Sequence, residues 1–64
     1  MFKIKLRKLR STWHWFVENP VGGGFGSNDV ASKKFVIRKA TQNIPIGAPY
    51  QVFRDGTLEG EFVK

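Results

Sequence analysis

The stretch that decides the fold is FKIKLRKLRSTWHWFV, residues Phe2–Val17. It holds five of the eleven basic residues and four of the nine aromatic residues, and it contains no acidic residue. Its first residues alternate between apolar and basic, in the order Phe2, Lys3, Ile4, Lys5, Leu6 and Arg7. A period of two places the apolar side chains on one face of a strand and the basic side chains on the other. The stretch therefore predicts a half-buried strand with an apolar face and a cationic face.

A helix is the competing interpretation of residues 2–10. An apolar stripe with the spacing i, i+4, i+7 and i+11 would then consist of Phe2, Leu6, Leu9 and Trp13. No capping residue precedes the segment, and β-favouring residues follow it from Thr12 to Val17, so we expect a strand. Leu9 breaks the alternation, which predicts a bulge or a tight turn within Lys8–Ser11 and leaves a hairpin and a bent continuous strand both open.

The size and composition of the chain limit it to one small domain. A chain of 64 residues buries only about 60% of its unfolded surface, which leaves no room for a second core. The absence of cysteine excludes a disulfide framework and favours a reducing, cytoplasmic setting. No apolar run reaches the ~18 residues of a membrane span, and no apolar signal segment follows the basic start.

The charge of the chain is concentrated in two places. The net charge of the chain is +6. Residues 1–10 carry +5, a second basic group carries +4 and consists of Lys33, Lys34, Arg38 and Lys39, and residues 50–64 sum to −1. Such a distribution predicts attraction to a polyanion or to an acidic protein surface. A solvated strand face that only prevents edge pairing is the plainer interpretation.

A second strand and a glycine-rich loop are expected next. Over Thr12–Glu18, one face carries Trp13, Trp15 and Val17, which are expected mainly in the core, and the other carries His14 and Phe16. The segment NPVGGGFGSND, residues 19–29, predicts a mobile loop because Pro20 lacks a donor and four glycines lie within five positions. Its Phe25 is available either to enter a partner's pocket or to fold back. Ser27, Asn28 or Asp29 is expected to cap a short helical turn over Val30–Ser32.

The second half of the chain predicts further strands. KKFVIRK, residues 33–39, is typical of a buried strand, and a helix through Asn43 is the alternative. Asn43–Pro49 is expected to be a rigid connector. Asp55-Gly56 between two strand-like runs predicts a type I′ hairpin. Its expected register places Arg54 opposite Thr57, Phe53 opposite Leu58, Val52 opposite Glu59 and Tyr50 opposite Glu61, with a bulge or a close approach at Gly60 and with Phe53 and Leu58 on the core face.

Together these elements predict an all-β fold with at most one short helical turn. We expect a small antiparallel meander or an open SH3-like or OB-like barrel of four to five strands. The expected core consists of Phe2, Ile4, Leu6, Trp13, Trp15, Val17, Phe35, Ile37, Phe53, Leu58 and Phe62.

Catalytic machinery is nearly absent from the sequence. His14 is the one histidine, and it has no second ligand or base to work with, so neither a metal site nor a cofactor site is expected. The run Gly22–Gly26 lacks the lysine that ends a phosphate-binding P-loop. We therefore expect no enzyme and no small-molecule substrate.

Two functional hypotheses remain. The first is a nucleic-acid-binding β module, because cations that follow phosphates lie next to rings on which bases stack. The second is a small phage-type or mobile-element-type protein that inhibits or regulates another protein through its basic face and its loop. The expected contact residues for either partner are Lys3, Lys5, Arg7, Arg10, Lys34, Arg38, His14 and Trp15, with Phe25 as loop anchor and Lys34 and Arg38 included only if their strand neighbours the first. A membrane-surface peptide would require residues 2–16 to be an amphipathic helix.

Overall fold

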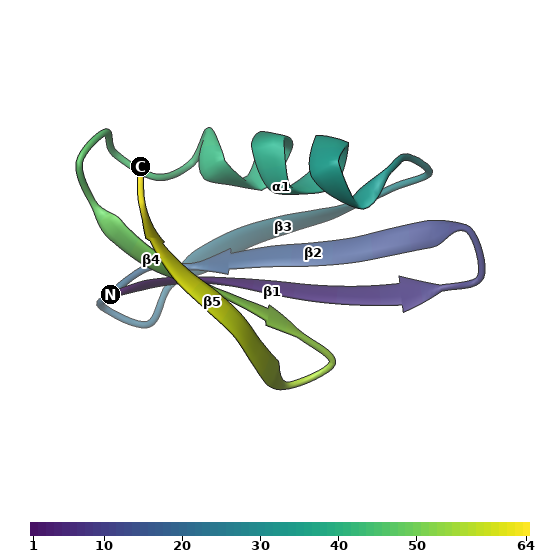
Figure 1. The fold of residues 1–64 in the computed structure, drawn as a ribbon, viewed down its shortest axis with the longest axis horizontal. Helices are drawn as coiled ribbons and strands as arrows, with labels where there is room; N and C mark the ends of the chain where they lie inside the picture. Colours follow the sequence, from purple (N-terminus) through teal and green to yellow (C-terminus); the bar gives the residue numbers. More distant parts are fainter.

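The protein is one open five-stranded sheet with a single helix on one face (Figure 1). The computed structural model describes every residue, Met1–Lys64. The elements in chain order are β1 (Phe2–Leu9), β2 (Thr12–Glu18), β3 (Gly24–Asp29), α1 (Lys33–Thr41), β4 (Pro49–Arg54) and β5 (Thr57–Val63). Their order across the sheet is β3-β2-β1-β4-β5, so the amino-terminal strand lies at the centre.

This arrangement confirms a small, mainly β fold of four to five strands. The strands do not form a meander throughout, because β1 and β4 are parallel while the other three pairs are antiparallel. The edge strands β3 and β5 do not pair with each other, so the sheet does not close into a barrel. The helix α1 connects the edge strand β3 to β4 and packs over β1 and β2.

The first half of the chain forms a hairpin, one of the two arrangements left open, and not a helix. Leu9 pairs with Thr12, and a two-residue turn at Arg10 and Ser11 joins β1 to β2. Arg10 takes a positive φ of 59°, which lets the chain reverse without glycine or proline. Residues 2–16 therefore do not form the amphipathic helix that a membrane-surface peptide would need.

The strand predicted over Lys33–Lys39 is wrong, and the helix that was the alternative is present. Ser32 caps it by accepting a hydrogen bond from the backbone N–H of Phe35 at 3.2 Å, so no separate turn forms over residues 30–32. Val36 and Ala40 lie one helical turn apart and are buried against the sheet. The apolar stripe is narrow, because Phe35 points away from the sheet, and this is why the sequence suggested scattered apolar residues.

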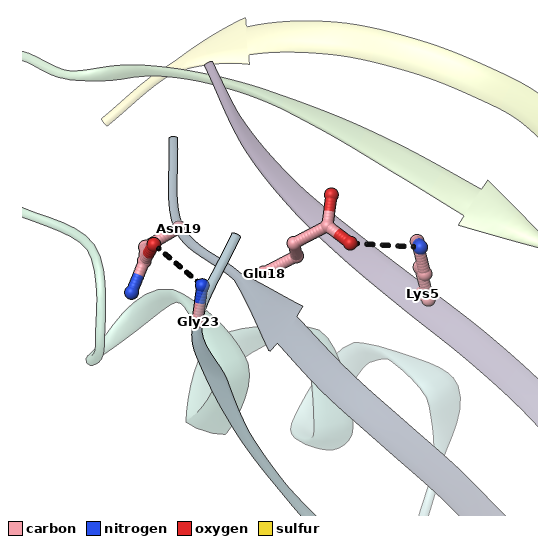
Figure 2. Close-up of polar contacts among 4 residues, drawn as sticks. All are labelled: Lys5, Glu18, Asn19 and Gly23. Carbon is pink, nitrogen blue, oxygen red and sulfur yellow. Dashed lines mark hydrogen bonds and ion pairs between the residues drawn. The ribbon is translucent and has the colours of Figure 1, made fainter. Parts of the chain in front are cut away.

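The predicted loop over residues 19–29 is wrong for its second half. Gly24–Asp29 pairs along its whole length with β2 and forms the edge strand β3. The turn itself is short, and Asn19 organises it: the side-chain oxygen accepts hydrogen bonds from the backbone N–H groups of Val21 and Gly23, at 3.0 and 3.1 Å. Figure 2 shows the bond from Gly23. Because its donors are satisfied locally, the turn has a defined structure.

The carboxy-terminal hairpin confirms the turn prediction and corrects the register beyond it. Asp55 and Gly56 have positive φ values of 50° and 82°, as a type I′ turn requires. Arg54 pairs with Thr57 and Phe53 pairs with Leu58, as expected. A register shift between Val52 and Phe53 then places Val52 opposite Gly60, not Glu59, and Tyr50 opposite Phe62, not Glu61. The bulge expected at Gly60 is therefore present.

The pairing of β4 with β1 decides which side chains of β4 reach the core, because Val52 lies opposite the buried Ile4. Val52 is buried on the helix side of the sheet, so its neighbour Phe53 lies on the opposite face with Leu58. The nine buried residues are Ile4, Leu6, Trp13, Trp15, Val17, Val36, Ala40, Ile44 and Val52. Five of these were expected, while Phe35, Leu58 and Phe62, also expected in the core, are exposed.

Candidate nucleic-acid interface

The sheet face opposite α1 carries the basic side chains of β1. Ile4 and Leu6 are buried under the helix, so the alternation along the strand directs Lys3, Lys5 and Arg7 to the uncovered face. β1 is the central strand, so these three cations lie along the middle of the face. We call this surface, formed by residues of all five strands on the side away from α1, the open face.

Two phenylalanines flank the central lysine of the open face. Lys5 pairs with Phe16 on β2 and with Phe53 on β4, so the three side chains form a row across the sheet. One register step further, Arg7 pairs with His14. Phe16 is 40% exposed and Phe53 is half-buried. The open face therefore alternates cations with flat rings.

The ring of Phe16 lies over a glycine pair in the edge strand. A Cβ atom added at Gly24 would come within 2.3 Å of the ring, and one added at Gly26 within 2.9 Å. Glycine is needed at both positions because any side chain there would displace the ring. The Phe16 ring thus rests on the β3 backbone, while 40% of the residue stays exposed.

Two adjoining depressions cross the open face. The larger, of about 680 Å³, lies between the β1–β2 pair and the β4–β5 turn. Its lining residues are Lys5, Leu6, Arg7, His14, Trp15, Phe16, Asp55 and Gly56. The smaller, of about 380 Å³, is lined by Lys3, Lys5, Phe53 and Gly56. They share Lys5 and Gly56, so together they form a shallow groove that runs across the strands from Phe16 to Phe53.

One of the three cations is paired within the molecule. The Lys5 ammonium donates a hydrogen bond to the Glu18 carboxylate at 3.1 Å, from β1 to β2 (Figure 2). Lys3 and Arg7 form no ion pair, and the Lys3 nitrogen lies 6.0 Å from the centroid of the Phe53 ring. Lys3 and Arg7 are therefore available to an anion directly, and Lys5 only in exchange for Glu18.

Not all of the expected contact residues share this face. Arg10 lies in the turn at the end of β1, next to the open face. Lys34 and Arg38 are exposed on the outer side of α1, so the sheet separates them from the β1 cations. They would join the site only if their segment were a strand beside β1, and it is a helix instead.

Trp15 and Phe25 belong to the helix side of the sheet. Trp15 is only 4% exposed, and its indole N–H donates a hydrogen bond of 2.8 Å to Asp29. Phe25 packs edge-on against the Trp15 ring, with 5.7 Å between the centroids. Trp15 is thus a core residue, and Phe25, although partly exposed, has folded back onto the sheet.

Asp29 connects the edge strand to the helix. Its carboxylate accepts hydrogen bonds from the Trp15 indole and from the Lys39 ammonium, the latter at 3.0 Å. The hydrogen bond from Trp15, and next that from Lys39, lower the pKa of Asp29 below its ordinary value of 3.8. The Asp29 carboxylate therefore links the end of β3 to β2 and to α1.

The sequence did not place Phe53 in this site. β4 alternates without a break, so the signal that could have found it is Val52: once Val52 packs under the helix opposite Ile4, its neighbour Phe53 must face the other side of the sheet. Two cations over an aromatic ring were also not predicted. Lys8 and Arg54 lie on the helix side, 5.5 and 5.1 Å from the Trp13 ring centroid.

Comparisons with protein families, with curated proteins and with solved structures find no match to this chain. No three histidine, aspartate or glutamate side chains gather where they could hold a metal ion. The nine-residue α1, the one helix, is too short to cross a membrane.

Proposed function

We propose that the protein is a non-enzymatic nucleic-acid-binding module and that the open face is its binding surface. The observation that carries the proposal is the line of Lys3, Lys5 and Arg7 along the central strand, on the one sheet face that the helix leaves uncovered. A nucleic-acid backbone presents closely spaced phosphates, which cations grouped on one uncovered face can contact. A cytoplasmic setting is part of the proposal, in keeping with a chain without cysteine.

The aromatic rings beside these cations favour nucleic acid over other anions. Phe16 and Phe53 offer flat surfaces to bases next to the positions of the phosphates. An acidic protein surface, bound by an inhibitor or regulator of the phage type, is the alternative partner. This alternative relied on a mobile loop with Phe25 as its anchor. The structure supports it less, because residues 24–29 form a strand and Phe25 is packed against Trp15.

Binding measured against salt tests the proposal. We expect a fluorescently labelled oligonucleotide to bind at low salt, and log K to fall with log[salt] with a slope of about −0.7 per phosphate contacted. Three contacts, one for each β1 cation, give a slope of about −2. No binding at low salt, or binding that does not depend on salt, would rule out this function.

A pair of double variants separates the open face from net charge alone. Lys3→Gln with Arg7→Gln removes two open-face cations, and Lys34→Gln with Arg38→Gln removes two cations from the far side of the molecule. Both variants lose two positive charges. We expect the first to flatten the salt slope to about −1 and to weaken binding strongly, and the second to leave the slope nearly unchanged. Equal losses in the two variants would show that the face is not the site.

A further inference from the structure

We infer that the open face selects single-stranded over double-stranded nucleic acid, with one base on Phe16, one on Phe53 and the phosphate between them at Lys5. The inference rests on the proposed function of the face and adds to it the kind of nucleic acid and its direction. The bound strand would follow the groove and so cross the β-strands instead of running along them.

The first support is that the exposed rings have fixed positions. Phe16 is held over Gly24 and Gly26, and an added Cβ at either glycine would meet its ring. Phe53 is half-buried between β1 and β5, next to Leu58. Rings that are already ordered lose little conformational entropy when a base stacks on them, which is what a stacking platform requires.

The second support is the spacing of the rings. Phe16 and Phe53 are each the direct neighbour of Lys5, so their backbones lie two strand spacings apart, or about 9.5 Å. Bases in a duplex are stacked about 3.4 Å apart and expose only their edges in the grooves. An unpaired strand can separate its bases and present their faces to rings at this distance.

The third support is the position of the cations relative to the rings. Lys5 lies on the strand between those that carry the two rings, and its ammonium, now 3.1 Å from the Glu18 carboxylate, would leave Glu18 for the backbone that joins two stacked bases. The Lys3 ammonium lies 6.0 Å from the Phe53 centroid. A base that stacks on Phe53 would displace the Lys3 ammonium from the ring, and Lys3 would then turn toward a phosphate. Rings and cations can thus be occupied together.

The test compares ring removal on two faces of the protein. Phe16→Leu and Phe53→Leu keep an apolar side chain but remove the ring, and Phe35→Leu does the same on the outer side of α1, where Phe35 is 49% exposed. We measure binding to an unpaired deoxythymidine oligonucleotide of about ten nucleotides and to a blunt duplex of the same length.

The expected result has two parts. The wild-type protein should bind the unpaired strand at least about tenfold more tightly than the duplex, and each open-face substitution should weaken single-strand binding by about 5- to 100-fold while duplex binding changes less than twofold. Phe35→Leu should change neither affinity. Thermal unfolding of each variant confirms that it is folded at the temperature of the assay. On the wild-type protein, the ring-proton resonances of Phe16 and Phe53 should shift when the oligonucleotide is added.

The two proposals fail in different ways. Equal affinity for duplex and single strand, or single-strand binding that Phe16→Leu and Phe53→Leu leave intact, would overturn the single-strand inference and leave nucleic-acid binding standing. Unshifted ring resonances in a saturated complex would overturn it too. If no oligonucleotide binds at low salt, the proposed function itself is wrong.

Discussion

Glu18 and Lys5 form an ion pair in the middle of the cationic face, with 3.1 Å between the carboxylate and the ammonium. Both side chains are partly exposed, at 30% and 52%. Such a pair is worth only about 0.2 to 1 kcal/mol, so an incoming phosphate can replace the carboxylate at little cost. Glu18 therefore acts as an internal competitor for the lysine at the centre of the proposed site.

The first prediction follows from this competition. Glu18→Gln should tighten binding to a single-stranded oligonucleotide by about two- to fivefold, because Lys5 no longer has to leave a carboxylate, and should change the free energy of unfolding by less than about 1 kcal/mol. Glu59→Gln is the matched control, since it removes the same charge and breaks an ion pair with Lys33 on the helix side. Equal gains in both variants would assign the effect to net charge and not to Lys5.

The second prediction concerns acid stability. The pKa of Asp29 is lowered in the folded protein by hydrogen bonds from Trp15 and then Lys39. Its contribution to stability is therefore fully present above the unfolded pKa, about 3.8, and is lost as the pH falls through the lowered folded value. We expect the urea midpoints of the wild-type protein and Asp29→Asn to differ at about pH 6 and to approach each other as the pH falls below 3.8. A difference that stays constant with pH would show that the charge of Asp29 is not what matters.

The third prediction concerns the turn between β2 and β3. The side-chain oxygen of Asn19 accepts two backbone hydrogen bonds, so Asn19→Ala should destabilise the protein by about 1 to 2 kcal/mol. Asn19→Asp keeps the acceptor oxygen and should cost less. Chemical denaturation of both variants gives the comparison. If Asn19→Ala is as stable as the wild-type protein, the turn does not depend on this side chain.

The strands that alternate cleanly could be predicted from the sequence. Apolar and polar residues alternate over residues 2–7 of β1, so Ile4 and Lys5 could be assigned to opposite faces without a structure. The turn at Asp55-Gly56 could also be predicted, because its chemistry is local and both residues adopt positive φ. The alternation in β1 is what predicts the cations of the open face.

The rest depended on contacts between distant parts of the chain. The glycines of β3 have no strand propensity of their own, and they form a strand because β2 supplies the pairing and Phe16 covers them. The helix buries only Val36 and Ala40, a stripe too narrow to recognise without the sheet that it covers. The second ring of the site, Phe53, depended on the pairing of β4 with the distant β1, which places Val52 and not Phe53 under the helix.

The fourth prediction concerns the one acidic residue at the wall of the larger depression, Asp55. Its carboxylate opposes the approach of a phosphate, and at a separation of about 8 Å in water the repulsion is about 0.5 kcal/mol, or roughly a factor of two in affinity. Asp55→Asn should therefore tighten oligonucleotide binding by about twofold at low salt, and the gain should shrink as salt is added. Asn-Gly is as suitable as Asp-Gly for a type I′ turn, so the melting temperature should not fall.

Asp55→Ala separates the charge from the turn. It removes the same carboxylate, but alanine at a φ of 50° is strained, so it should destabilise the protein by about 1 kcal/mol. Affinity measured well below the melting temperature of each variant should rise equally in both, while the melting temperature should fall only in Asp55→Ala. If only one of the variants gains affinity, the conformation of the β4–β5 turn, and not its charge, controls access to the groove.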